Sequence, residues 1–75
     1  MSVIGENIKK YREIRGLTQV DLAAAIGESK QTIWKYESGT VTNVPLPNIE
    51  AIARVLHCSP AELSGWADNE QQAID

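Results

Sequence analysis

Residues Thr18–Gly39 have the sequence TQVDLAAAIGESKQTIWKYESG, whose pattern indicates two short helices joined by a tight turn. Thr18 is a favoured N-cap for the first helix, and Asp21, three residues later, completes a variant of the capping box. Gly27 follows the last apolar residue of that helix and tolerates the left-handed backbone of a turn. Ser29 caps the next helix, which the final glycine ends.

The spacing of small and aliphatic residues within this stretch is typical of two helices that cross at a steep angle. Ala23 is small enough to let two backbones approach, Gly27 lies in the turn, and Ile33 places a branched side chain beneath the crossing. Together these offsets favour a DNA-binding helix-turn-helix. An ordinary helical hairpin is the alternative, because glycines are common in the turns between helices.

The size and composition of the chain predict one small all-α domain. The chain has 75 residues, of which 43% are hydrophobic, so a compact core fits and a large one does not. A compact bundle of five short helices is an economical arrangement at this length. We expect the domain to cover residues 1–66, and the polar, acidic residues 67–75 to form a flexible tail.

Three more helices are expected around the central pair. Residues 3–15 place apolar side chains on one helical face. After a loop that contains two prolines, a helix from about Pro47 to Leu56 carries a clear apolar stripe. A short helix from about Pro60 to Gly65 begins with another capping box, and Leu63 is expected to anchor it in the core.

Charge is distributed unevenly along the chain. The net charge is −3, with +1 on residues 1–40 and −4 on residues 41–75. Any surface that binds a polyanion is therefore expected in the N-terminal half. Because few phosphates can be neutralised, non-specific affinity for nucleic acid is expected to be modest.

Several other classes of protein find no support in the sequence. No apolar run approaches the ~20 residues of a membrane span, and no signal peptide is visible. Cys58 is the only cysteine, which favours a reducing cytoplasm and an inert, buried thiol. One cysteine and one histidine do not give the spacing of a metal site, so we expect no metal and no cofactor. The chain lacks a phosphate loop and a nucleophile–base spacing, so we do not expect an enzyme.

The chain resembles the phage repressor and Cro family of helix-turn-helix proteins, also described as lambda repressor-like. The residues that carry the resemblance are IKKYREIRGLTQVDLAAAIGESKQTIWKYESG and IEAIARVLHCSPAEL, within residues 4–65. The resemblance implies that the third helix enters the major groove of double-stranded DNA. The residues that would then contact base edges are Lys30, Gln31, Thr32 and Lys35. Glutamine can pair with adenine and lysine with guanine, although a solvated helix face would carry the same residue types.

Contacts to the DNA backbone are implied for a second set of residues. Gln19 matches a family glutamine that contacts a phosphate and braces the recognition helix; the alternative is a plain surface glutamine. The other expected backbone contacts are Ser29, Ser38, Thr40, Thr42 and Asn43. The loop after the third helix has no lysine or arginine, which departs from many relatives.

Three further residues receive a structural interpretation. Arg12 and Glu37 match a family pair that forms a buried ion pair, so we assign them to structure and not to DNA contact. Trp34 lies off the apolar face of its helix. It is expected to cover the edge of the core, with contact to the DNA backbone as the alternative.

The resemblance implies a sequence-specific transcriptional regulator, such as a phage or prophage repressor or its N-terminal domain, in the cytoplasm of a bacterial host. Such domains bind two-fold symmetric operators as homodimers. The candidates for dimer contacts are Pro60, Leu63 and Trp66, with capping of the core as the alternative for Trp66. A different function remains open, that of a protein-interaction module such as an antitoxin or antirepressor with a regulatory protein partner.

Overall fold

The structure, a computed structural model, describes residues 3–65. In this range the chain forms five helices, which are α1 (Val3–Ile14), α2 (Gln19–Ile26), α3 (Lys30–Ser38), α4 (Leu46–Leu56) and α5 (Pro60–Ser64). The predicted all-α fold is confirmed, and the expected helix boundaries agree to within one residue. The predicted tail lies outside the described residues.

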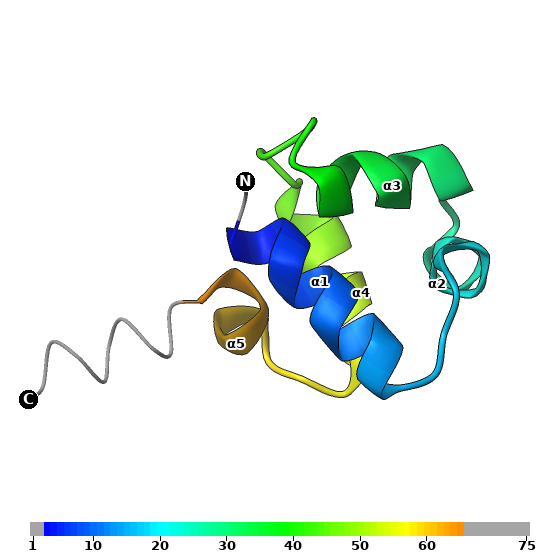
Figure 1. Cartoon of the computed structure of the whole chain (residues 1–75). Helices are drawn as coiled ribbons and strands as arrows, with labels where there is room; N and C mark the ends of the chain where they lie inside the picture. Colours follow the sequence, from blue (N-terminus) through cyan, green and yellow to red (C-terminus); the bar gives the residue numbers. More distant parts are fainter. Residues whose placement is uncertain (1–2, 66–75) are drawn as a thin grey trace, which may run out of the picture.

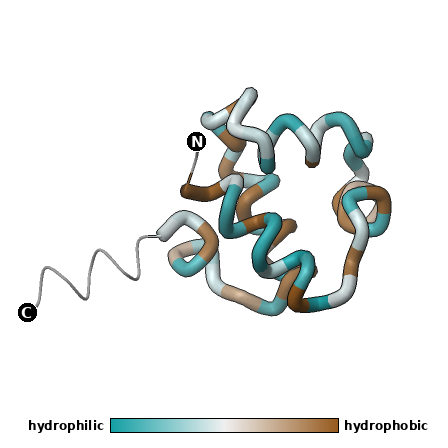
Figure 2. The backbone as a smooth tube through the Cα atoms, viewed as in Figure 1, coloured by the Kyte–Doolittle hydropathy of each residue, from teal (hydrophilic) through white to brown (hydrophobic). Residues whose placement is uncertain are grey.

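The helices pack around α1, which lies at the centre of the view in Figure 1. Helix α1 contacts α3, α4 and α5, and α2 packs against both α3 and α4. Figure 2 shows short hydrophobic segments in every helix, separated by hydrophilic ones. The fully buried side chains at the centre are Ile8, Leu22, Ile33, Ile52, Leu56 and Leu63. Each helix therefore buries one face in a shared core. For α3, this packing leaves the opposite face exposed at the surface.

Helix starts follow the capping signals of the sequence. The backbone N–H of Asp21 donates to the Thr18 hydroxyl at 3.0 Å, and the Thr18 N–H donates to the Asp21 carboxylate at 2.9 Å. The Ser29 hydroxyl accepts from the Thr32 N–H at 3.2 Å. Gly27, at the end of α2, has φ of 73°, as expected for a left-handed cap. These local contacts set the ends of α2 and the start of α3.

The capping box at α2 predicts a pH-dependent stability. The hydrogen bonds from the Thr18 backbone and hydroxyl lower the pKa of the exposed Asp21 carboxyl below its ordinary value of 3.8. The stabilisation is therefore fully present above the unfolded-state pKa and is lost as the pH falls through the lower folded-state pKa. Thermal unfolding should show Asp21→Asn less stable than wild type at about pH 6 and equal to it at about pH 2. An equal difference at both pH values would contradict this role of the Asp21 charge.

At Gly5 the backbone of α1 closely approaches the backbone of α3. A Cβ atom at Gly5 would overlap the carbonyl oxygen of Tyr36 and lie 3.2 Å from that of Glu37. Backbone atoms cannot move aside as a flexible side chain can, so a methyl group here would push the two helices apart. This contact therefore helps to set how α3 is presented.

Gly5→Ala is expected to lower the free energy of unfolding by up to about 2 kcal/mol. Overpacking costs about 1–3 kcal/mol, and the better helix propensity of alanine returns about 1 kcal/mol. Urea denaturation would measure the difference, with the exposed neighbour Glu6→Ala expected within about 0.5 kcal/mol of wild type. A Gly5→Ala protein more stable than wild type would show that helix propensity alone decides at this position.

Candidate nucleic-acid interface

The outer side of α3 carries the predicted base-contacting residues. Lys30, Gln31 and Lys35 are exposed and Thr32 is partly exposed. On the opposite side of the helix, Ile33 and Tyr36 are buried in the core. The structure therefore brings the four predicted base contacts together on one accessible surface, with none of them in the core. Their contact with DNA stays a prediction.

The crossing of α2 and α3 has the geometry of a helix-turn-helix. Ala23 is buried where the two helices pack together, and Gly27 takes the left-handed conformation in the turn. The Glu28 N–H donates to the carbonyl of Ala23 at 2.9 Å, which closes the end of α2. The helical pair predicted from the spacing is thus present.

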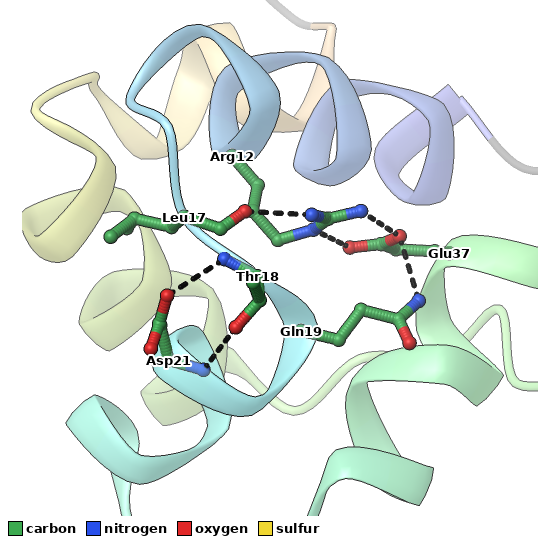
Figure 3. Close-up of polar contacts among 6 residues, drawn as sticks. All are labelled: Arg12, Leu17, Thr18, Gln19, Asp21 and Glu37. Carbon is green, nitrogen blue, oxygen red and sulfur yellow. Dashed lines mark hydrogen bonds and ion pairs between the residues drawn. The ribbon is translucent and has the colours of Figure 1, made fainter.

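An ion pair joins α1 to α3 beneath this surface, as Figure 3 shows. Arg12 Nε donates to Glu37 Oε2 at 2.6 Å, and Arg12 Nη2 donates to Glu37 Oε1 at 3.0 Å. Arg12 Nη1 also donates to the Leu17 carbonyl at 2.8 Å. Arg12 is only 9% exposed, and its hydrogen bond to the Glu37 carboxylate raises the pKa of the guanidinium. The buried pair predicted for these residues is confirmed.

Gln19 connects the start of α2 to the same carboxylate. Its amide nitrogen Nε2 donates to Glu37 Oε1 at 3.1 Å (Figure 3). The half-buried Gln19 side chain therefore braces α3, as the family resemblance implied. Its phosphate contact stays a prediction.

Trp34 requires a correction. It is 53% exposed and does not belong to the core cluster, so the expectation that it covers the core edge is wrong. The reason is its helical position, since it follows the buried Ile33 by one residue and is rotated about 100° away from the core. Trp34 instead lines a hollow of about 450 Å³ together with Gln19, Lys30 and Gln31.

Asn48 is a residue that sequence reasoning missed. Its side-chain amide nitrogen donates to the Tyr36 hydroxyl at 2.8 Å and to Glu28 Oε2 at 3.3 Å. Glu28 follows α2 in the turn, where a free carboxylate would oppose a nearby phosphate. Asn48 holds that carboxylate toward the start of α4. No local signal could have revealed this contact, because the partners lie 12 and 20 residues away.

Hydroxyl groups cluster at both ends of α3. At its start, the Ser29 and Thr32 hydroxyls lie 3.1 Å apart. At its end, the Ser38 and Thr40 hydroxyls lie 2.9 Å apart, and the Ser38 hydroxyl donates to the Lys35 carbonyl at 3.3 Å. The other predicted backbone contacts, Thr42 and Asn43, are exposed in the loop that follows.

Of the three residues predicted to form dimer contacts, one is buried, one is exposed and one lies outside the described residues. Leu63 is fully buried, so the expectation that it anchors α5 in the core is confirmed and its place in a dimer interface is wrong. Helix α5 packs against α1 and α4. The Asn7 amide nitrogen donates to the Leu63 carbonyl at 3.0 Å and fixes α5 to α1. Pro60 is exposed, and Trp66 lies outside the described residues.

Three other features of the described residues concern metal ligands, membrane-spanning helices and a reactive thiol. No three His, Cys, Asp or Glu side chains gather there as metal ligands would. None of its helices has the length and hydropathy needed to cross a membrane. Cys58 is half-buried, not fully buried as expected, and desolvation raises the pKa of its thiol. The thiol is therefore protonated at neutral pH and is a weak nucleophile.

Known proteins share this arrangement. A family model described as "Helix-turn-helix" matches residues 8–63. The antitoxin PezA of Streptococcus pneumoniae is 33% identical over 63 residues, which cover 84% of this chain and 39% of the antitoxin. This chain thus spans about two fifths of that relative's length.

Two solved structures have a similar fold. SinR, a master regulator for biofilm formation solved in complex with DNA, has a TM-score of 0.77 and 32% identity over 80% of this chain and 95% of that chain. The P22 c2 repressor, solved with a synthetic operator, has a TM-score of 0.76 and 27% identity over 84% of this chain and 94% of that chain. The chain therefore belongs to the helix-turn-helix DNA-binding family of the Cro/C1, lambda repressor-like type.

Proposed function

We propose that this chain is the sequence-specific DNA-binding part of a transcriptional regulator that inserts α3 into the major groove. The observation that carries the proposal is the polar outer face of α3, held rigidly by the ion pair and the Gln19 brace beneath it. Lys30, Gln31, Thr32 and Lys35 contact base edges. Glutamine pairs with adenine through N6 and N7, and lysine reaches O6 and N7 of guanine.

Contacts to the sugar-phosphate backbone set the register of α3 in the groove. We assign them to Gln19, Ser29, Ser38, Thr40, Thr42 and Asn43, which precede and follow the base-contacting residues in the chain. Two structures of similar fold were solved in complex with DNA, which supports DNA as the ligand. Phosphate contacts fix position and carry little sequence information.

The finer proposal is a phage-type repressor that binds a two-fold symmetric operator in the cytoplasm without a cofactor. Two copies would place their α3 helices in successive major-groove turns, about 34 Å apart. Pro60 and Trp66 remain the candidates for contacts between the copies, and Leu63 does not. Repression then follows from occupancy of the operator, with no enzymatic step.

A second candidate is a module that binds a protein partner, as an antitoxin does. The similarity to PezA favours it. The salt dependence of DNA binding separates the two functions. A regulator should prefer one duplex over its scrambled version at several salt concentrations, whereas a protein-interaction module should bind both weakly or not at all.

Selection of binders from a random duplex library tests the main proposal directly. We expect enrichment of a motif with two inverted half-sites about one helical turn apart. The control is a variant in which Lys30, Gln31, Thr32 and Lys35 are all alanine, with circular dichroism to show that it folds. The control should enrich nothing. Absence of a motif with wild type, or the same motif with both proteins, would contradict the proposal.

A further inference from the structure

We propose that the DNA-binding surface extends beyond the helix-turn-helix onto α1, through a hollow between Lys9 and Trp34 that holds one stretch of the sugar-phosphate backbone. This inference rests on the proposed function, because it adds contacts from Lys9 and Trp34 to the backbone of the same bound duplex. The occupant is the DNA backbone itself, with the phosphate at Lys9 and the deoxyribose against Trp34.

The hollow lies on the side of Trp34 that faces α1. Its volume is about 320 Å³, and its lining residues are Lys9, Arg12, Gln19, Trp34, Glu37 and Ser38. The neighbouring hollow of about 450 Å³, which contains the base-contacting Lys30 and Gln31, is also lined by Gln19 and Trp34. Trp34 and Gln19 thus form a shared wall, and the two hollows are continuous with the α3 surface. A backbone strand held in the 320 Å³ hollow would therefore lie next to the bases that Lys30 and Gln31 contact.

The charges of the hollow favour an anion. The Arg12 charge is offset by the Glu37 carboxylate at 2.6 Å. Of the residues in 3–65 that line the hollow, Lys9 is the one that adds a positive charge without an ion-pair partner. The exposed ammonium group of Lys9 is therefore available to a phosphate. A phosphate also matches the hydrogen-bonding capacity of Gln19, whose amide nitrogen has two N–H groups and gives one to Glu37.

Trp34 supplies the apolar part of the contact. Its indole is 53% exposed in the free protein, next to groups that a polyanion would approach. A deoxyribose offers apolar C–H groups between successive phosphates, so the indole and Lys9 match the two components of one nucleotide's backbone. Burial of the exposed indole surface on binding contributes favourable free energy.

This contact would add affinity without adding sequence preference, since sugar and phosphate are the same for every base. It also gives the chain a cation for the DNA backbone where the loop after α3 has no lysine or arginine.

The first test compares Lys9→Ala with its neighbour Lys10→Ala on the duplex obtained by selection. Both lysines are exposed on α1, but Lys10 lies over the Tyr11 ring, 5.7 Å from its centroid, and does not line the hollow. Lys9→Ala should reduce the slope of log K against log salt by about one, and Lys10→Ala should leave it unchanged. Equal slopes for the two variants would overturn the inference.

The second test measures Trp34. Trp34→Ala should weaken binding by roughly tenfold on both the selected and the scrambled duplex, with the base preference intact. In a Trp66→Phe background, Trp34 is the only tryptophan, so its quenching by acrylamide should fall when duplex is added. A changed base preference, or quenching that is the same with and without DNA, would show that Trp34 does not lie on the backbone.

The outcomes separate this inference from the proposed function. If wild type binds no duplex, the proposed function is wrong and this inference with it. If wild type binds its selected duplex while Lys9→Ala and Trp34→Ala bind equally well, only the inference is wrong. Unfolding curves for each variant ensure that lost affinity is not lost folding.

Discussion

Glu37→Ala is expected to lower the free energy of unfolding by about 3–5 kcal/mol. The reason is the position of Arg12, whose guanidinium is almost fully buried and makes two of its three hydrogen bonds to the Glu37 carboxylate. Without that carboxylate the cation stays buried and unpaired. Gln19 also loses the acceptor that ties α2 to α3. Urea denaturation followed by circular dichroism measures the change.

Two controls test whether the loss comes from the unpaired charge. The double variant with methionine at both Arg12 and Glu37 should recover much of the stability, because apolar side chains of similar volume need no partner. Glu50→Ala removes an exposed carboxylate and should stay within about 0.5 kcal/mol of wild type. If Glu37→Ala behaves like Glu50→Ala, the ion pair does not stabilise the fold.

Gln31→Ala should weaken binding to the selected duplex by about 1–3 kcal/mol and relax the preference at one base pair. Gln31 is exposed on the outer face of α3, where its amide can form two hydrogen bonds to an adenine. Truncation removes both bonds and leaves the fold intact, since the side chain is not part of the core. Competition binding against duplexes with single base changes measures both effects.

Gln19→Ala is the matched control, because it removes the same side chain from a position beside the groove. It should weaken binding about equally on every duplex, which is the signature of a phosphate contact. Since Gln19 also braces Glu37, its unfolding curve must be measured in parallel. An unchanged base preference in Gln31→Ala would show that another residue reads that base pair.

The helices and their ends are encoded locally, which is why they could be predicted. Thr18, Ser29 and Ser59 each place a hydroxyl where it accepts a hydrogen bond from an N–H three residues later. Gly27 takes the left-handed conformation that its place after the last apolar residue required. Such signals involve neighbours in the chain and need no knowledge of the rest of the fold.

The buried ion pair of Arg12 and Glu37 was predictable for a different reason. The two residues are 25 positions apart, and only the family pattern connected them. Residue types alone would have placed two charges on two separate helices. The same holds for Gln19 as the brace of α3.

The exposure of single side chains was decided by packing between distant elements. Trp34 lies outside the core because it is rotated about 100° from the buried Ile33 on α3, whereas Leu63 is enclosed because α5 closes against α1 and α4. Asn48 meets Glu28 only because α4 returns beside the turn.

The amino-acid sequence by itself therefore determined the five helices, their order and the polar face of α3, since these depend on caps and periodicity within a few residues. The tertiary structure alone decided which side chains from other helices border that face. Those outcomes depend on where helices that are far apart in the chain pack together. Sequence patterns over a few residues do not specify such long-range contacts.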